Sequence, residues 1–597
     1  MSLPPSILDE QLRHFPYTEL RPKQSEVLRH LEKHPYFMLQ APTGFGKSVL
    51  TFTGIWYRMI WGERQLWLFA KTKTQLQRVF LHNLKEHYAH PPADQLTIVP
   101  LIARRDLCIQ SQRLSCRCCP AKAKARYLSA FRVTELLQHF SLGSCPKTFV
   151  GFQQQLTKFG CPYDLIRRMI PQVNIVLLTQ GYLESLFLRE VLDRLLLNAE
   201  CYNFRYGQRE VIIDEAHNFG PTVEAVLTRE QLTRALEIGS FPVVKALVTL
   251  LGQPLGRVDR PRGAMPAGLK ALDVFLRQKR SPRFLTPEDY EVLQAVRTFV
   301  ERKGQYWVLN DQGLIQLNPW PDRIFNFLRM RFNRIILLSG TFHNIRAYGV
   351  YYGFGDKLPF FSYCVPSPPE RRSQLFFGAY YHPAVSSKPE NRTPELYEWT
   401  ADIIHELALL ADNHTLVFVP SYEVLNTIYP LLQARLQSQL SLYREPTKGR
   451  IPFLNKLKIG SESVVLAVYG GKFSEGIEIR HPDTKQSRVR LVILVGLPFP
   501  PPTPEYHLLN RLYSKRWFPR FVHWALVERT LYTKVQQCLG RTIRSDQDQG
   551  AAVILDYRAV LRLRIPGMRV FRTESELLNG LMLALIRAKR ADILDTK

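Results

Sequence analysis

The sequence has no run of about 18 apolar residues, and it therefore predicts no membrane-spanning helix. Its first residues, MSLPPSILDEQLRHF, lack the basic start and apolar core of a secretory signal. We therefore expect a cytoplasmic, nucleoid-associated protein, or a nuclear one in a eukaryote. Acidic residues are scarce: 52 Asp and Glu stand against 80 Lys and Arg, a formal charge of +28. Because like charges repel, this excess predicts a polyanionic partner, with nucleic acid as the first candidate and a membrane disfavoured.

Cysteine is also scarce, with nine in 597 residues, but six of the nine fall in one window. In a cytosolic chain, such clustering favours a metal site over disulfides. Between Cys108 and Cys161, eight Lys and Arg face one acid, a net charge of +7 that predicts a DNA-facing module. Its aromatic residues either stack on bases or form the small core of the module, and the core is the commoner outcome. These aromatic residues include Phe149, Phe152 and Tyr163.

Apolar runs bounded by turn residues recur along two long segments and are typical of buried parallel strands. They alternate with helical stretches, which predicts an α/β fold with two α/β domains in series. The runs in the first segment are 36–40, 64–70, 174–179, 210–214 and 334–339, and those in the second are 415–420, 463–469, 489–496 and 551–556. Two stretches, 106–165 and 222–330, interrupt the first segment. We interpret both as insertions, the second mainly helical with few strand signals.

A glycine-rich turn, APTGFGKS (Ala41–Ser48), follows the first apolar run and precedes a helical stretch. It begins with alanine instead of the consensus glycine, but its strand–turn–helix context is that of a phosphate-binding loop. Lys47 would reach the β- and γ-phosphates of ATP, and Ser48 would ligate Mg²⁺. The loop backbone and the helix start would surround the phosphates. The predicted nucleotide-binding residues of this loop are Thr43, Gly44, Gly46, Lys47 and Ser48.

An apolar strand also delivers adjacent carboxylates in VIIDEAHN (Val211–Asn218). Asp214 would hold Mg²⁺, and Glu215 would polarise the water that attacks the phosphate. His217 would sense the γ-phosphate or couple the two domains. A phosphate-binding loop about 170 residues upstream argues against an ordinary polar strand end.

QCLGRTIRS (Gln537–Ser545) carries two arginines that we expect on one helix face, Arg541 and Arg544. They would cross the cleft between the domains and neutralise charge on the transferred phosphoryl group. Taken alone, the pattern equally fits a solvated basic helix face. With Gln537, these arginines complete the predicted catalytic set.

In this order, the three motifs resemble those of superfamily 2 helicases. Their detailed sequences, with those of further motifs, resemble the XPD and DinG family. RPKQ (Arg21–Gln24) is similar to the motif whose glutamine, here Gln24, contacts adenine. LFAKTKTQ (68–75), SGTF (339–342), TLVFVPSY (415–422), GGKFSEGIEI (470–479) and GLPFPPP (496–502) are similar to further family motifs. Glu478 stands where the family usually has aspartate.

The resemblance implies two RecA-like motor domains, the first with an iron–sulfur insertion and an arch insertion. It also implies a [4Fe–4S] cluster, although four thiolates alone would suit zinc as well. ARRDLC and CPYDLIRR flank the family's first and last ligands, here Cys108 and Cys161. We favour Cys119 and Cys145 as the inner pair, with Cys116 plus Cys119 as the alternative.

The resulting domain prediction assigns the first motor to 1–105, 166–221 and 331–370, the iron–sulfur domain to 106–165, the arch to 222–330 and the second motor to 371–597. The resemblance implies an ATP-dependent helicase that moves 5′→3′ on single-stranded DNA and opens forked DNA, as a monomeric motor open to recruitment into a larger complex. The alternatives are an RNA or R-loop helicase, and a scaffolding subunit of a repair or CRISPR-associated complex with a dispensable motor. The intact Lys47, Glu215 and Arg541 argue against a scaffold.

Overall fold

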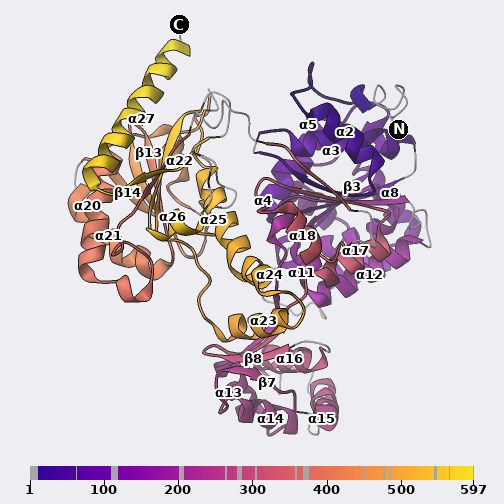
Figure 1. Ribbon diagram of the computed structural model, residues 1–597. Helices are drawn as coiled ribbons and strands as arrows, with labels where there is room; N and C mark the ends of the chain where they lie inside the picture. Colours follow the sequence, from indigo (N-terminus) through magenta and orange to yellow (C-terminus); the bar gives the residue numbers. More distant parts are fainter. Residues whose placement is uncertain are drawn as a thin grey trace.

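The computed structural model describes residues 11–42, 44–61, 64–108, 119–200, 208–261, 265–278, 285–302, 306–355, 360–366, 375–436, 439–449, 451–474, 477, 479–483, 486–543, 548–563, 565 and 567–595. Two α/β units lie side by side, and a smaller unit lies below them (Figure 1). No helix in these ranges is long and apolar enough to span a membrane.

The first α/β unit contains a seven-stranded parallel sheet in the order β11-β1-β10-β5-β2-β4-β3. Its strands are β1 (Tyr36–Gln40), β2 (Gln65–Ala70), β3 (Ile98–Leu101), β4 (Ile175–Thr179), β5 (Arg209–Ile213), β10 (Arg334–Ser339) and β11 (Phe361–Cys364). The sheet is flanked by α2 (Gln24–Lys33), α3 (Lys47–Trp61), α4 (Lys73–Gln75), the π-helix η1 (Leu76–His82), α5 (Asn83–His87), α11 (Gly181–Glu184), α12 (Leu186–Glu200), α17 (Asp322–Arg331) and α18 (Ile345–Tyr351). Every residue of β2 and β5 is buried, which explains their continuous apolar sequence and confirms the predicted parallel strands.

The second unit also has a seven-stranded parallel sheet, in the order β14-β15-β13-β16-β17-β12-β18. Its strands are β12 (Leu375–Tyr380), β13 (His414–Val419), β14 (Ser441–Arg444), β15 (Ser463–Val468), β16 (Val489–Val495), β17 (Gly550–Leu555) and β18 (Arg569–Phe571). Helices α20 (Pro394–Leu410), α21 (Tyr422–Leu436) and α27 (Glu574–Asp595) pack on one face, and α22 (Leu454–Ile459), α25 (Arg529–Leu539) and α26 (Arg558–Arg562) pack on the other. The alternation expected from the sequence is therefore confirmed in both units.

The described part of the first insertion is mainly helical, with an isolated β-bridge that pairs Ser141 with Thr97. It contains α6 (Arg104–Leu107), α7 (Pro120–Tyr127), α8 (Ala130–Gln138), α9 (Phe149–Thr157) and α10 (Pro162–Met169). Helix α10 contacts α6, α7, α8 and α9, so it organises the others around itself.

The second insertion combines helices with a sheet. It contains α13 (Arg229–Ile238), α14 (Pro242–Leu250), α15 (Met265–Gln278) and α16 (Pro287–Glu301). Strands β6 (Thr222–Thr228), β7 (Gly256–Val258), β8 (Tyr306–Asn310) and β9 (Gly313–Asn318) form a four-stranded antiparallel sheet in the order β6-β9-β8-β7. Helices are the larger part, as expected, but the sequence analysis missed the sheet. Strand β6 at the start of the insertion pairs with β9 near its end, and a pairing between such distant segments leaves little signal in the local sequence.

A helical segment, α23 (Pro504–Ser514), α24 (Pro519–His523) and the π-helix η7 (Trp524–Glu528), links the three units. The domain prediction included it in the second motor. Its apolar side chains instead join the core of the first unit, among them Leu512, Tyr513 and Trp524. Helix α23 also contacts β7 and β8. The segment runs up from the lower unit and continues into α25 (Figure 1).

Candidate functional site

The three motifs of the first unit meet at one edge of its sheet. Strands β1, β10 and β5 are neighbours in register, with Gln40 opposite Ser339 and Leu337 opposite Ile213. The phosphate-binding loop, the SGTF segment and the DEAH turn begin where these strands end. Ligands of open α/β sheets bind at the carboxyl ends of the strands, so this edge is the expected nucleotide site.

The phosphate-binding loop turns sharply between β1 and α3. Gly44 and Gly46 have φ values of 80° and 87°, which side chains disfavour, and α3 begins at Lys47. The Lys47 ammonium donates to the carbonyls of Ala41, at 2.9 Å, and Pro42, at 3.3 Å. It therefore lies within the loop, at the N-terminus of a 15-residue helix that favours anions. Thr43 lies outside the described residues.

Gln24 is hydrogen-bonded to the same loop. Its side-chain amide donates to the carbonyl of Phe45 at 2.7 Å, and its side-chain oxygen accepts from the backbone N–H of Arg21 at 2.8 Å. The Arg21 guanidinium in turn donates to the carbonyl of Gly44. Gln24 is buried, and both of its polar ends are bonded within the protein. Its predicted contact with adenine stays a prediction.

The DEAH carboxylates differ in exposure. Asp214 is only 7% exposed, whereas the Glu215 side chain is 31% exposed and its backbone is left-handed, with φ 51°. Burial, followed by the charge of Glu215, raises the pKa of Asp214. Burial alone would also raise the pKa of Glu215, but the hydrogen bond to His217 and the nearby positive charges lower it. Glu215 is therefore held ionised, as a group that accepts a proton from water must be.

Gln180 was missed by the sequence analysis. It is fully buried after β4, and its amide donates to the backbone carbonyl of Asp214 at 2.6 Å. Only its position at the end of a predicted buried strand could have drawn attention to it.

His217 joins elements of both units. Its Nδ1 lies 2.7 Å from Ser339 Oγ, 3.1 Å from Thr341 Oγ1 and 3.2 Å from Glu215 Oε2. Its Nε2 lies 3.3 Å from the amide nitrogen of Gln537, on helix α25 of the second unit. A ring protonated at Nδ1 and accepting at Nε2 satisfies this network. The DEAH turn, the SGTF segment and the second unit therefore share one histidine.

Arg541 lies beyond the end of α25, which stops at Leu539. The prediction that Arg541 and Arg544 share one helix face is therefore wrong for Arg541, because Gly540 ends the helix. The guanidinium donates to the carbonyls of Ser474 and Ile477, and its charge contributes to the lowered pKa of Glu215. Arg541 thus faces the first unit from a turn. Arg544 and Glu478 lie outside the described residues.

Comparisons with known proteins agree with this geometry. A family model described as DEAD_2 matches residues 68–234, and a model described as Helicase C-terminal domain matches residues 404–564. The ATP-dependent DNA helicase XPD of Sulfolobus acidocaldarius is 27% identical over 429 residues, which cover 67% of this chain and 72% of that protein. A regulator of telomere elongation helicase 1 homolog from Drosophila ananassae is 29% identical over 193 residues, covering 30% of this chain and 19% of that protein.

A solved structure named XPD helicase superposes with a TM-score of 0.66 at 18% identity, covering 93% of this chain and 100% of that one. The Xpd4 structure from S. tokodaii superposes with a TM-score of 0.57 at 16% identity, covering 92% of this chain and 100% of that one. Together these matches support an XPD/DinG-like ATP-dependent DNA helicase of superfamily 2. Its two α/β units are the RecA-like motor domains of that fold.

The predicted cluster cysteines of this XPD-like helicase lie at helix ends. Cys108 ends α6, Cys119 is the N-cap of α7, and Cys161 is the N-cap of α10. Burial raises the pKa of Cys161, and nearby Cys119 adds a smaller effect in the same direction. Gly160 fixes this proximity, because a Cβ on it would lie 2.7 Å from the backbone nitrogen of Ala125 in α7. Two thiols at adjacent helix N-termini suit thiolate ligation of a metal.

The complete ligand set is not assembled in the part of the chain that the structure describes. There, no three His, Cys, Asp or Glu side chains are placed to hold one metal ion. Cys145 is buried, and its Sγ lies 3.4 Å from the Lys85 ammonium. Cys116 and Cys118 lie outside the described residues. The thiols of Cys119 and Cys161 are chemically suited to a cluster, and the full ligand set stays a prediction.

Of the two roles considered for the module's aromatic residues, the small core is the one that the structure shows for most of them. Phe149 is 4% exposed and Phe152 is fully buried, while Tyr163 packs against the core and under the guanidinium of Arg167. The most exposed aromatics of the module are instead Tyr127, at 89%, and Phe131, at 70%, whereas Phe159 is 39% exposed. The sequence analysis missed all three.

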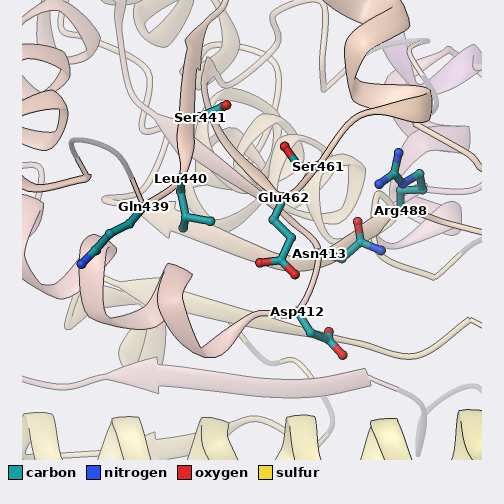
Figure 2. Close-up of a pocket in the computed structure, with 8 residues that line it drawn as sticks. All are labelled: Asp412, Asn413, Gln439, Leu440, Ser441, Ser461, Glu462 and Arg488. Carbon is teal, nitrogen blue, oxygen red and sulfur yellow. The ribbon is translucent and has the colours of Figure 1, made fainter.

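One pocket lies away from this chemistry. It has a volume of about 670 Å³ and is lined by Asp412, Asn413, Gln439, Leu440, Ser441, Ser461, Glu462 and Arg488 (Figure 2). These residues precede or begin β13, β14, β15 and β16, at the sheet edge opposite the second motor's helicase motifs. Arg488 is bonded to the carbonyls of Leu457 and Gly460, and Asp412 to Arg490. We assign this pocket no function.

Proposed function

We propose that this chain is an ATP-dependent helicase that moves 5′→3′ along single-stranded DNA and unwinds duplex DNA. The observation that carries the proposal is the joint between the motors, where Gln537 of the second motor lies 3.3 Å from His217 of the DEAH turn. The charge of Arg541, from the same motor, contributes to the lowered pKa of Glu215. A site completed by two domains links hydrolysis to their relative movement. The direction follows from the family resemblance.

The chemistry follows from the positions of four groups. Lys47 binds the β- and γ-phosphates at the start of α3, and Ser48 and Asp214 would hold Mg²⁺, which neutralises phosphate charge when bound. Glu215 takes the proton of the attacking water. Arg541 stabilises the charge that develops on the transferred phosphoryl group. Loss of the γ-phosphate then weakens the joint and lets the motors part.

The nucleic-acid partner is proposed from charge and exposed rings. The formal charge of +28 and the net +7 between Cys108 and Cys161 favour a phosphate backbone. Tyr127 and Phe131 project into solvent from this basic module, as rings that stack on bases do. We propose that the module contacts the strand ahead of the motors, and that the protein works on single-stranded and forked DNA.

We further propose a structural [4Fe–4S] cluster in the module, with Cys108, Cys119, Cys145 and Cys161 as ligands and Cys116 as the alternative inner ligand. The position of Cys119 and Cys161 at the starts of α7 and α10, two helices in contact, supports it. When bound, the cluster would join α6, α7 and α10. Because thiolate ligands hold separate helices together, it would stabilise the module without taking part in hydrolysis.

Strand displacement on forked and single-overhang DNA tests the function. We expect ATP-dependent unwinding of a 5′-overhang substrate, ATPase stimulated by single-stranded DNA more than by RNA, and more than tenfold weaker DNA binding between about 50 and 200 mM salt. Unwinding of 3′-overhang substrates alone would contradict the direction. Stronger stimulation by RNA would favour an RNA or R-loop helicase, and a Lys47→Arg variant with full biological activity would favour a scaffold.

A further inference from the structure

Arg529, the first residue of α25, is buried in an aromatic cage and was not singled out by the sequence. It is 8% exposed, and Tyr348, Tyr351, Tyr352 and Tyr513 surround it. The guanidinium carbon lies 4.9 Å from the centroid of the Tyr351 ring, in cation–π contact. Tyr348 and Tyr351 lie in α18 of the first motor, and Tyr352 directly follows that helix. Arg529, by contrast, begins a helix of the second motor. The cage therefore lies at the junction of the two motors.

The guanidinium is bonded to the DEAH turn. Its Nη1 donates to the backbone carbonyls of His217 and Phe219, each at 3.2 Å. Tyr352 of the cage donates its hydroxyl to the carbonyl of Ala216 at 2.6 Å. The turn η5 (Ala216–Asn218) is a single 3₁₀ turn, which cannot satisfy its own carbonyls. Arg529 and Tyr352 supply the missing donors, and so they fix the backbone that carries Glu215 and His217.

Burial of the Arg529 cation lowers the stability of the fold unless other interactions offset the lost hydration. In the ranges that the structure describes, no carboxylate is paired with Arg529, and its guanidinium donates to the carbonyls of Ala525, His217 and Phe219. An uncompensated buried charge normally destabilises a fold by several kcal/mol. The glycine at position 220 also makes space for the guanidinium, because a Cβ there would lie only 2.9 Å from Nη2 of Arg529. Gly220 does not have a left-handed backbone, so the guanidinium, not the turn, excludes a side chain there.

Helix α25 carries further contacts along the same face. Tyr532 stacks on His343, next to the SGTF segment, with ring centroids 3.6 Å apart and planes within 5°. Gln537 reaches His217. Positions 529, 533 and 537 are four residues apart and therefore share one face of α25, with Tyr532 beside them. This face is turned toward the first motor. A shift of this helix therefore acts on the DEAH turn at two points, its backbone and its histidine.

We propose that Arg529 is a positioning residue for ATP hydrolysis. It anchors the start of α25 to the DEAH turn and sets Glu215 and His217 in place relative to Gln537 and Arg541. Its role rests on the proposed ATP-driven motor, and it touches neither nucleotide nor water. The movement of the second motor reaches the hydrolytic carboxylate through this anchor, in addition to the direct contact of Gln537 with His217.

The test compares Arg529→Met and Arg529→Lys with a matched control, Arg516→Met, in the full chain. Arg516 lies in the same linking segment and contacts the first motor through Asp322, at 2.7 Å, and the Trp320 ring, but it does not touch the DEAH turn. We measure kcat and KM for DNA-stimulated ATP hydrolysis, per ATP-binding molecule, together with Tm. Misplacement of a catalytic group by about 1 Å costs up to about 100-fold, so kcat of Arg529→Met should fall by roughly tenfold or more.

KM for ATP should stay within about twofold of the wild-type value, because the phosphate-binding loop is untouched. Arg529→Lys should recover part of kcat, since an ammonium still donates to the turn. Arg516→Met should keep the wild-type kcat. A folded Arg529→Met protein with unchanged kcat per ATP-binding molecule would overturn the inference, and so would an equal loss in Arg516→Met. A wild-type protein without ATPase activity would contradict the proposed function itself, and the inference with it.

A double-mutant cycle separates positioning from general loss of folding. Gly220→Ala should lower kcat on its own, because its Cβ displaces the guanidinium. In an Arg529→Ala background the same change should cause no further loss, since the clashing group is gone. Additive losses in the double variant would show that Gly220 and Arg529 act independently and would overturn the anchor.

Discussion

The nucleotide site and the cysteine module of this helicase are held together in different ways. The site lies where three adjacent parallel strands end, and strand register brings Lys47, Asp214 and Ser339 to one edge. The module is a set of helices around α10, with its cysteines at helix ends. Backbone pairing therefore fixes the geometry of the site without a ligand. The geometry of the module rests on side-chain packing and, by our proposal, on a cluster.

This difference implies that substitutions in the module and in the nucleotide site impair different activities. The largest expected effect is in the module: Cys108→Ser and Cys161→Ser should lose the cluster and all detectable unwinding while basal ATPase stays within about twofold. Purified wild-type protein should be brown and hold about four irons. Cys364→Ser, at an exposed cysteine on the edge of the first sheet, is the control and should stay brown.

Two results would contradict the proposed cluster or its ligands. Colourless protein with stoichiometric zinc would contradict the iron–sulfur cluster but leave the motor intact. Loss of colour in Cys116→Ser with retention in Cys145→Ser would contradict the proposed inner ligand and favour the alternative.

In the nucleotide site, Glu215→Gln should bind ATP but hydrolyse it at least about 100-fold more slowly, because the group that takes the proton is gone. Its iron content should match the wild-type protein, since the carboxylate lies on a separate sheet. Single-turnover hydrolysis and metal analysis of one preparation measure both. Hydrolysis near the wild-type rate would remove Glu215 as the base.

Gly160→Ala sharpens the comparison from within the module. The added Cβ would meet backbone atoms of Ala121 and Ala125, so α7 and α10 must separate, at about 1–3 kcal/mol. We expect faster iron loss under a chelator and unchanged basal ATPase. Gly355→Ala, where a Cβ meets nothing within 4 Å, is the control. Equal iron retention in both variants would show that the contact of α7 with α10 does not hold the ligands.

The smallest expected effect is at the exposed rings. Tyr127→Ala and Phe131→Ala should each weaken binding of single-stranded DNA by roughly fivefold to tenfold, near the lower end of measured stacking contributions. Both side chains are largely exposed, so Tm should hardly change. Phe152→Ala, in the core of the module, should lower Tm instead. Unchanged DNA affinity in both ring variants would place the strand elsewhere on the module.

The sequence alone determined the motor strands and the position of the nucleotide site. Apolar runs such as Tyr36–Gln40 and Arg334–Ser339 became the strands that were predicted, because continuous burial on both faces leaves a continuous apolar sequence. The motifs follow those strands directly. Parallel pairing then requires their residues to meet at one edge, so a local pattern was enough.

Only the tertiary structure decided which aromatic rings form the core, where the segment Pro504–Glu528 packs, and what Arg529 binds. Phe152 and Phe131 are alike as sequence, yet one is fully buried and the other 70% exposed. Arg529 looks like any basic helix residue until Tyr351 and the DEAH turn, more than 170 positions away, enclose it. Such contacts join distant parts of the chain, and no periodicity in a local window records them.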